Sequence, residues 1–144
     1  MFAHLVSFSM YSRKAGSAFG SHVMELAEPP LTSRSLDDLR ISLAMMYESD
    51  SVLVLNWDFL PDQHNHPGCY PYGYHVSFRV QNPDGEHFGS GDLVRSRPLD
   101  TQEELRSAED YLRLNAQSVV RLIGCKPLIE VSAKALQNFK KNQQ

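Results

Sequence analysis

An internal repeat constrains the fold of this chain more than any other feature of its sequence. HLVSFSM begins at His4, and the related string YHVSFRV covers residues 74–80. The strings FGS, PL, SLDDLR and SVLVLNWDFL return in the second half as FGS, PL, TQEELR and SVVRLIGCKPL. All five matches keep their order, with offsets between 66 and 70 residues. Chance rarely preserves such an order, so we interpret the chain as a tandem duplication.

The duplication predicts the domain organisation. The two copies cover residues 4–60 and 74–128, joined by a linker at 61–73 and followed by a tail at 129–144. A copy of about 55 residues buries too little apolar surface to be secure alone. We therefore expect a single domain over residues 1–144, in which the second copy completes the sheet that the first begins.

Each copy reads as two strands, a helix and a third strand, in the order ββαβ. Apolar and polar residues alternate around Phe8 and Phe78, which is typical of half-buried strands. Ser35 and Thr101 have the spacing of helix N-caps, and leucines recur at helical spacing after each of them. These patterns predict an α+β fold with a six-stranded, mostly antiparallel sheet, two helices on one face and a short C-terminal helix.

The phase of the strands predicts which side chains are buried and which are free to meet a partner. Phe8 and Phe78 should occupy equivalent buried sites beneath the two helices. Leu53, Leu55 and Trp57 share a phase that faces outward. Because open sheet edges and uncovered apolar faces attract partners, we expect a homodimer or a higher homo-oligomer.

Composition and charge exclude several classes of partner. The formal net charge is −3, from 14 basic and 17 acidic side chains, so we do not expect binding to duplex nucleic acid. The chain has no apolar run of about 20 residues and no charged-then-apolar leader, which predicts a cytoplasmic protein without a membrane partner. Its two cysteines, Cys69 and Cys125, fit a reducing compartment.

Two groups of residues raise the possibility of metal or enzyme chemistry, and neither has the full pattern. Zinc could be ligated by a linker group that lacks a second cysteine pair, and its members are Asp62, His64, His66 and Cys69. His75 and Ser77 have the His-x-Ser spacing of two-histidine phosphoesterases, whereas His4 and Ser7 are one residue too far apart. We therefore predict no metal site, no catalytic residue and no cofactor.

Aromatic and arginine side chains gather around the second copy and suggest a ligand site. Aromatic faces stack on bases, and the arginine fork grips phosphate. We predict that Arg79, Arg95 and Arg97 bind phosphate. Phe88 and Tyr72 would then stack on a base, and Asn82 would hydrogen-bond to the base or the ribose.

The string VSFSM…GSAFGS…VLVLNW resembles small proteins of phages and prophages, in which a VSFSY-type strand leads to a Gly-Phe-Gly turn and an LNW-like strand. It is similar in this respect to anti-defence sponges of the Thoeris anti-defence type. The second copy departs from the pattern, with RLIGC in place of VLVLNW. The resemblance implies a homo-oligomer that binds cyclic ADP-ribose isomers or cyclic oligonucleotides in the cytoplasm of an infected bacterium and does not cleave them.

Three functional hypotheses follow. The leading one is non-catalytic sequestration of a cyclic nucleotide-type immune signal. The second is a protein that binds and inhibits a host defence complex, suggested by six carboxylates spread over the first half (Glu25, Glu28, Asp37, Asp38, Glu48 and Asp50). The third is a phosphoesterase that uses His75 and Ser77.

Overall fold

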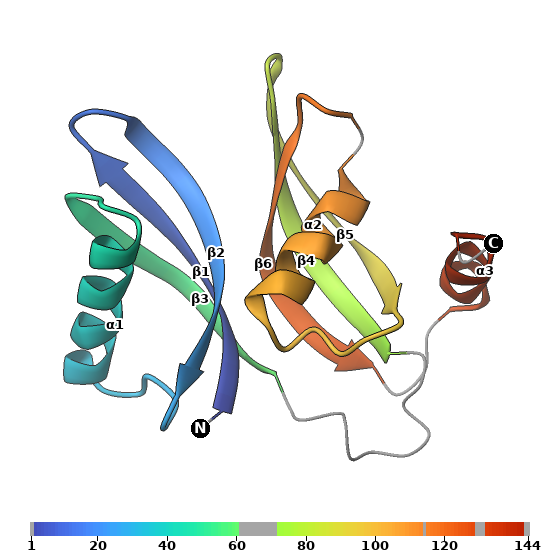
Figure 1. Cartoon of the computed structure of the whole chain (residues 1–144), viewed down its shortest axis with the longest axis horizontal. Coiled ribbons are helices and arrows are strands. Elements are labelled where there is room, and N and C mark those ends of the chain that lie inside the picture. The colour runs from blue at the N-terminus through green and yellow to red at the C-terminus, as the bar shows by residue number, and fades with distance from the viewer. Residues whose placement is uncertain (1, 61–71, 114, 129–131, 143–144) are drawn as a thin grey trace.

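The computed structural model describes residues 2–60, 72–113, 115–128 and 132–142. The two halves repeat the order ββαβ, and a helix follows them (Figure 1). The first half consists of β1 (Phe2–Ser12), β2 (Gly16–Leu26), α1 (Ser33–Met46) and β3 (Ser51–Leu60). The second half consists of β4 (Tyr72–Asn82), β5 (Gly85–Arg95), α2 (Gln102–Leu112) and β6 (Val119–Leu128), and α3 (Ala133–Asn142) comes last. The predicted α+β class, six strands and C-terminal helix are confirmed.

The two halves agree in detail as well as in order. In each half the first strand lies between the other two and pairs with both in antiparallel fashion, giving the orders β2-β1-β3 and β5-β4-β6. The hairpin turns carry Gly16 and Gly85 at positive φ, where an L side chain would be strained. A bulge shifts the register after Ser7 in one half and after Ser77 in the other. This shared irregularity supports the duplication.

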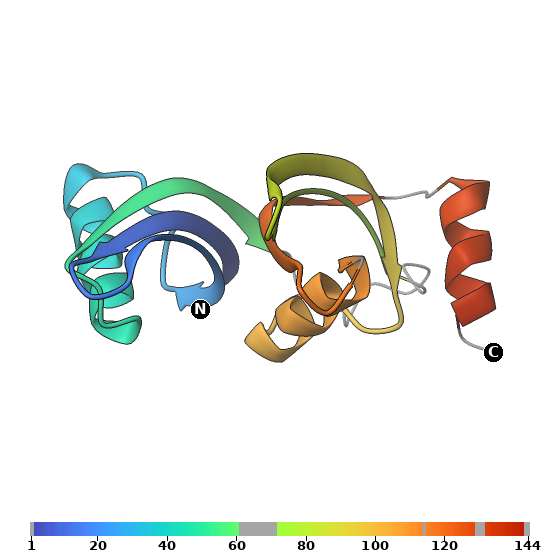
Figure 2. The ribbon, with the colours of Figure 1, turned by 90° about the horizontal axis from the view of Figure 1, so that it is seen from above.

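Helices α1 and α2 cover one side of the strands, as the sequence predicts (Figure 2). Thr101 caps α2 as expected, because its side chain accepts a hydrogen bond from the Glu104 backbone N–H. Ser35 does not cap α1: the N-cap is Thr32, and Ser35 is the third helical residue of a capping box with it. Because Thr32 forms the capping box one turn before Ser35, α1 begins one turn earlier than predicted. α1 therefore has 14 residues, whereas α2 has 11.

The six strands form two three-stranded sheets and not the single six-stranded sheet that the sequence predicts, because they pair only within each half; side chains join the two sheets at β3 and β6. Asn56 Nδ2 donates to the Ile123 carbonyl at 3.1 Å, and Asp58 Oδ2 accepts from the Cys125 N–H at 2.8 Å. A Cβ added at Gly124 would lie 3.2 Å from Asp58 Oδ2. Polar side chains of β3 therefore take the place of a backbone ladder between the halves, and glycine admits them.

Two clusters form the core. The first lies under α1 and contains Val6, Phe8, Leu39, Leu43 and Val52. The second lies under α2 and also takes Leu5 and Leu60 from the first half; its other buried members are Tyr74, Val76, Leu93, Leu99, Leu105, Ala108, Leu122 and Cys125. The halves thus share apolar packing. The cluster that both halves share is the one under α2.

The predictions of which strand side chains are buried and which face outward are confirmed in part. Phe8 is fully buried, and Phe78 is partly buried against the second cluster. Leu53 and Leu55 are exposed as expected, but Trp57 packs against the first cluster, so the prediction that it faces outward is wrong. The bulge at β3 reverses the phase between Val54 and Asn56, which turns Trp57 to the helix side.

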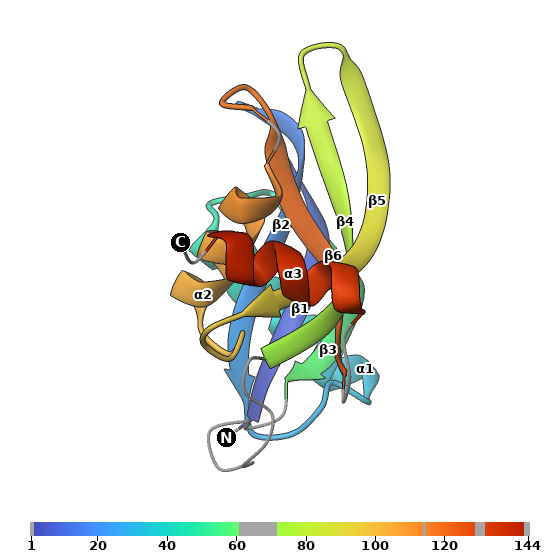
Figure 3. The ribbon, with the colours of Figure 1, turned by 90° about the vertical axis from the view of Figure 1, so that its right-hand side faces the viewer.

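Helix α3 lies against the outer side of the second half, where it contacts β5 and crosses the direction of the strands (Figure 3). Leu136 and Phe139 are partly buried, and the basic Lys140 and Lys141 lie in its last turn. Among the helices that the structure describes, none is both long and apolar enough to cross a membrane.

Candidate ligand-binding site

The six predicted site residues fall into two groups at opposite ends of the second sheet. Arg79, Asn82 and Phe88 lie toward the β4–β5 turn, where Arg79 is directly opposite Phe88 and Asn82 opposite Gly85. Tyr72 is paired with Arg95 at the far end, and Arg97 follows. Seven residues of strand between Tyr72 and Arg79 correspond to about 23 Å. One small ligand cannot contact both groups within a single chain.

The group at the far end faces a groove of about 470 Å³ beside the start of α2. Tyr72 and Arg97 line it together with three carboxylates, those of Asp100, Glu103 and Glu104. Arg97 is mostly exposed and lies 3.9 Å from the Glu104 carboxylate. Three acidic side chains around one arginine repel phosphate, so this groove is a poor anion site.

Arg95 does not point into that groove as a free cation. Its Nη2 donates to Ser107 Oγ at 2.7 Å, and its guanidinium carbon lies 5.7 Å from the centre of the Tyr111 ring. These contacts hold the side chain over α2. Arg95 therefore stabilises the packing of the helix on the sheet, and its predicted role in phosphate binding has no support from its surroundings.

The group near the turn has a more suitable geometry, because an aromatic ring from the first half joins it. The guanidinium carbon of Arg79 lies 4.3 Å from the centre of the Phe19 ring, within cation–π range. Phe88, which is the direct cross-strand neighbour of Arg79, is 65% exposed. Phe19 and Phe88 both belong to the repeated string FGS and are therefore equivalent positions of the two halves.

The polar atoms of this group are only partly satisfied. Arg79 forms an ion pair with Glu86, which lies opposite Gln81 on β5. Arg79 Nε and Asn82 Oδ1 are buried and have no hydrogen-bond partner among the described residues. Unpaired buried polar atoms are costly, so a donor and an acceptor left open here favour a ligand that supplies the missing contacts.

Phe19 and Glu86 were not predicted as site residues. Phe19 belongs to the first half, and no local pattern indicates that it lies against β4. The repeat carried a usable signal, however, because Phe88 was selected and Phe19 is its equivalent in FGS. A rule that each site residue of one copy predicts its equivalent in the other copy identifies Phe19.

The phosphoesterase residues are placed differently in the two halves. His75 Nδ1 lies 3.1 Å from Asp92 Oδ1, so a carboxylate orients this ring. Ser77 follows two residues later on the same face of β4. In the first half His4 is buried against the Phe59 ring, and the buried Ser7 hydroxyl has no hydrogen-bond partner in the part of the chain that the structure describes. His4 and Ser7 therefore do not repeat, in the first half, the arrangement of His75 and Ser77.

A buried polar network joins the halves beneath the site. Glu109 of α2 is 2% exposed and accepts from the Leu122 N–H at 2.8 Å and from the Ser21 hydroxyl. Arg106 donates to Glu109 Oε1 at 2.5 Å and to the Ser21 carbonyl at 2.8 Å. Because every oxygen of the carboxylate is paired, we assign this network to holding β2 against α2.

His22 extends that network toward α1. Its Nδ1 lies 2.7 Å from Tyr47 Oη, and Arg106 Nη2 donates to the same oxygen at 3.3 Å. Burial, and then the nearby Arg106 charge, lower the pKa of His22. Burial is also the main cause that raises the pKa of Tyr47. The ring is thus neutral at pH 7 and shares a hydrogen bond with the protonated tyrosine hydroxyl.

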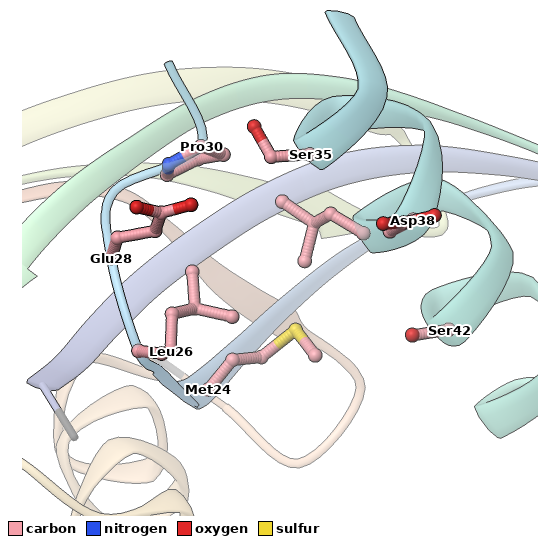
Figure 4. A pocket seen from close by; sticks show the side chains of 9 residues that line it. Met24, Leu26, Glu28, Pro30, Ser35, Asp38 and Ser42 are labelled. Atoms are coloured by element: carbon pink, nitrogen blue, oxygen red, sulfur yellow. The ribbon is translucent and has the colours of Figure 1, made fainter. Parts of the chain in front are cut away.

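A smaller apolar groove of about 190 Å³ opens between β2 and α1 (Figure 4). Met24 and Leu26 line it from β2, and Leu39 lines it from α1. Glu28 and Asp38 give it an acidic rim. An acidic, apolar groove does not suit a phosphate-bearing ligand.

No group of three metal-ligating side chains is present among the residues that the structure describes. The candidate zinc ligands Asp62, His64, His66 and Cys69 lie outside those residues, as does most of the predicted linker. Burial raises the pKa of the Cys125 thiol to about 12, helped by the Asp58 carboxylate, so this cysteine is a protonated core residue.

Comparisons of the chain with protein-family models, with curated proteins and with solved structures gave no match. No family assignment follows from them. The resemblance to anti-defence sponges stays a prediction, and a function has to be inferred from the residues of the site.

Proposed function

We propose that this protein binds and sequesters a nucleotide-type immune signal, a cyclic ADP-ribose isomer or a cyclic oligonucleotide, in the cytoplasm of a phage-infected bacterium. The observation that carries the proposal is the pair of equivalent phenylalanines at Arg79: the guanidinium carbon lies 4.3 Å from the centre of the Phe19 ring, and Phe88 is the direct cross-strand neighbour of Arg79. An arginine fork beside aromatic rings suits a ligand in which a phosphate is next to a base.

Binding uses the polar atoms that the free protein leaves unpaired. A phosphate replaces the half-exposed Glu86 carboxylate on the Arg79 guanidinium and accepts from Nε as well. Asn82 Oδ1 accepts only from a base amine or a ribose hydroxyl that reaches round the β4–β5 turn, because Asn82 and Arg79 lie on opposite faces of β4. The exposed Phe88 ring stacks on a base. Sequestration requires affinity only, and no bond of the ligand is broken.

The test is to incubate the protein with a panel of cyclic nucleotides, denature it and analyse the small molecules that it retained. A sponge depletes one nucleotide and releases it intact. Calorimetric titration of that nucleotide then compares variants. Arg79→Ala should weaken binding by roughly 10- to 150-fold, which corresponds to a charge-assisted contact of about 1.5–3 kcal/mol. Glu86→Gln should strengthen binding, because it removes a competing carboxylate.

Arg97→Ala is the matched control, since it removes an arginine from the other end of the sheet and should leave affinity unchanged. Equal affinity for the Arg79→Ala variant and the native protein would contradict the proposed site. If no nucleotide of the panel is depleted or altered, the protein is not a nucleotide binder, and the protein-inhibitor hypothesis takes its place.

The second candidate function is phosphoester hydrolysis, favoured by the hydrogen bond between His75 and Asp92. Asp92 would orient His75 as a general base for water or for Ser77. The same incubation distinguishes it, because an enzyme returns a changed nucleotide. His75→Ala would abolish that change and would leave a sponge unaffected.

A further inference from the structure

β3 is one of the four edge strands of the two sheets, and the first part of its outer edge lacks a backbone partner among the described residues. On one side β3 pairs with β1. On its other side, the residues from Asn56 onward lie beside β6, which the Asn56 and Asp58 side chains bind. For the preceding residues, Ser51 to Leu55, no backbone hydrogen bond on that side is found within the part of the chain that the structure describes. Figure 2 shows β3 as the outermost strand of the first half.

The other outer strands are in contact with neighbouring elements. β2 is contacted by α2 and β6, and β5 is contacted by α3. Unpaired edges are usually protected by proline, by charged side chains or by an overlying element. The stretch SVLVL at residues 51–55 has neither proline nor charge, and Leu53 and Leu55 are 60% and 43% exposed. In the second half the position of Leu53 is held by Arg121, because these residues pair with Ser9 and Arg79 respectively.

We propose that two copies of this chain pair through residues 51–55 of β3, antiparallel about a two-fold axis at Leu53. The occupant is a second copy because the edge is complementary to itself: it is neutral, apolar and open over one short stretch. Residues that pair across two strands point to the same face of the sheet. A two-fold axis normal to the sheet leaves each residue on its own face, so it must pass between a residue and the same residue of the second copy. Centring on Leu53 pairs all five open residues.

The same register keeps like charges apart and removes exposed leucine side chains from water. Ser51 lies opposite Leu55 of the second copy, and Asp50 lies opposite Asn56, so no like charges face each other. The two Leu53 side chains cover each other on the face away from α1. The sheets become one six-stranded sheet, β2-β1-β3 followed by β3-β1-β2 of the second copy. Both α1 helices then lie on one side of this sheet.

Cysteine crosslinking tests the register. In a Cys69→Ser background, Leu53→Cys places two thiols opposite each other with Cβ atoms about 4.5–5.5 Å apart, close to the spacing of a disulfide. Mild oxidation should yield a covalent dimer at least tenfold faster than for Leu31→Cys, a control at a 75% exposed leucine elsewhere on the first half. The buried Cys125 does not compete. Equal rates for the two variants would overturn the proposal.

Light scattering tests the edge itself. The native chain should have twice its 16.3 kDa monomer mass, and Leu53→Arg, which copies the residue of the second half, should restore the monomer mass. Met45→Arg, at another 75% exposed position on α1, should stay dimeric. Thermal melts confirm that the variants fold. A monomeric native chain, or a dimeric Leu53→Arg variant, would show that β3 is not the contact.

Discussion

The two halves have one topology and one bulge, yet the loop that leads into the helix packs in opposite ways. In the second half Leu99 is 1% exposed and belongs to the core, whereas its equivalent in the first half, Leu31, is 75% exposed. The residue at one strand position explains the difference. Tyr74 accepts a hydrogen bond from the Leu99 N–H at 2.8 Å, which fixes the loop over the sheet.

The first half has His4 in place of Tyr74, and a histidine ring does not reach as far. His4 Nδ1 bonds to the nearby Phe2 carbonyl, and the Leu31 N–H turns to the Pro29 carbonyl at 2.8 Å. The loop stays away from the sheet, and the groove between β2 and α1 remains open. A single hydrogen bond between loop and strand thus accompanies a buried leucine in one copy and is missing where the equivalent leucine is exposed in the other.

The helices differ for a related reason. The buried position Leu43 of α1 is matched by Glu109 of α2, at the offset of 66 residues that relates SLDDLR to TQEELR. α1 contacts β3 of its own sheet, where leucine suits an apolar surface. α2 also contacts β2 of the other half. There Glu109 meets Ser21 and Arg106, which an apolar residue would leave unpaired.

The largest difference between the halves in the cost of a substitution, measured as unfolding free energy, is expected for the equivalent phenylalanines. Phe8→Ala should lower the free energy of unfolding by about 3–5 kcal/mol, the usual range for a fully buried phenylalanine. Phe78→Ala should cost roughly half as much, because its ring is partly exposed. Urea unfolding of both variants measures the two costs. A larger loss for Phe78→Ala would reverse the assignment of the better-packed core.

A second, smaller contrast concerns the loop leucines. Leu99→Ala should cost about 2–4 kcal/mol, since it leaves a cavity beside Tyr74. Leu31→Ala should change stability by less than about 0.5 kcal/mol, because the side chain lies mostly in water. The same unfolding experiment serves for both. Equal losses would mean that Leu31 closes over the groove in solution.

The smallest effect is expected from pH. The pKa of His22 is lowered in the folded protein, so between that value and its unfolded pKa of about 6.5 the unfolded chain binds more protons. Stability from this group is therefore complete above about pH 6.5 and falls as the pH drops further. Because the ring is only partly buried, solvent screens the nearby charge and the loss should stay below about 1 kcal/mol.

His22→Gln separates this contribution from that of the carboxylates. The variant keeps a hydrogen-bonding side chain near Tyr47 but no longer titrates. Its unfolding free energy should fall less than that of the native protein between about pH 7 and about pH 5. A slope identical to that of the native protein would remove His22 from the pH dependence.

The order of elements and their phase were predictable from the sequence alone, because both are local or periodic properties. The repeat and the alternation around Phe8 and Phe78 predicted two ββαβ halves, and Thr101 was found as a cap from its spacing to Glu104. Part of the hairpin register was predictable too, since it places Arg79 opposite Phe88 and Asn82 beside the turn; whether these residues bind a ligand stays a prediction.

Tertiary packing decided the rest. The bulge turned Trp57 inward, and the extra turn of α1 moved the cap from Ser35 to Thr32. Phe19 meets Arg79 only because the outer face of β2 packs against the second half. Periodicity shows which face of a strand is apolar, but the position of one sheet against another depends on side chains far apart in the chain. Asp58 at the Cys125 N–H and Glu109 at Ser21 fix that position.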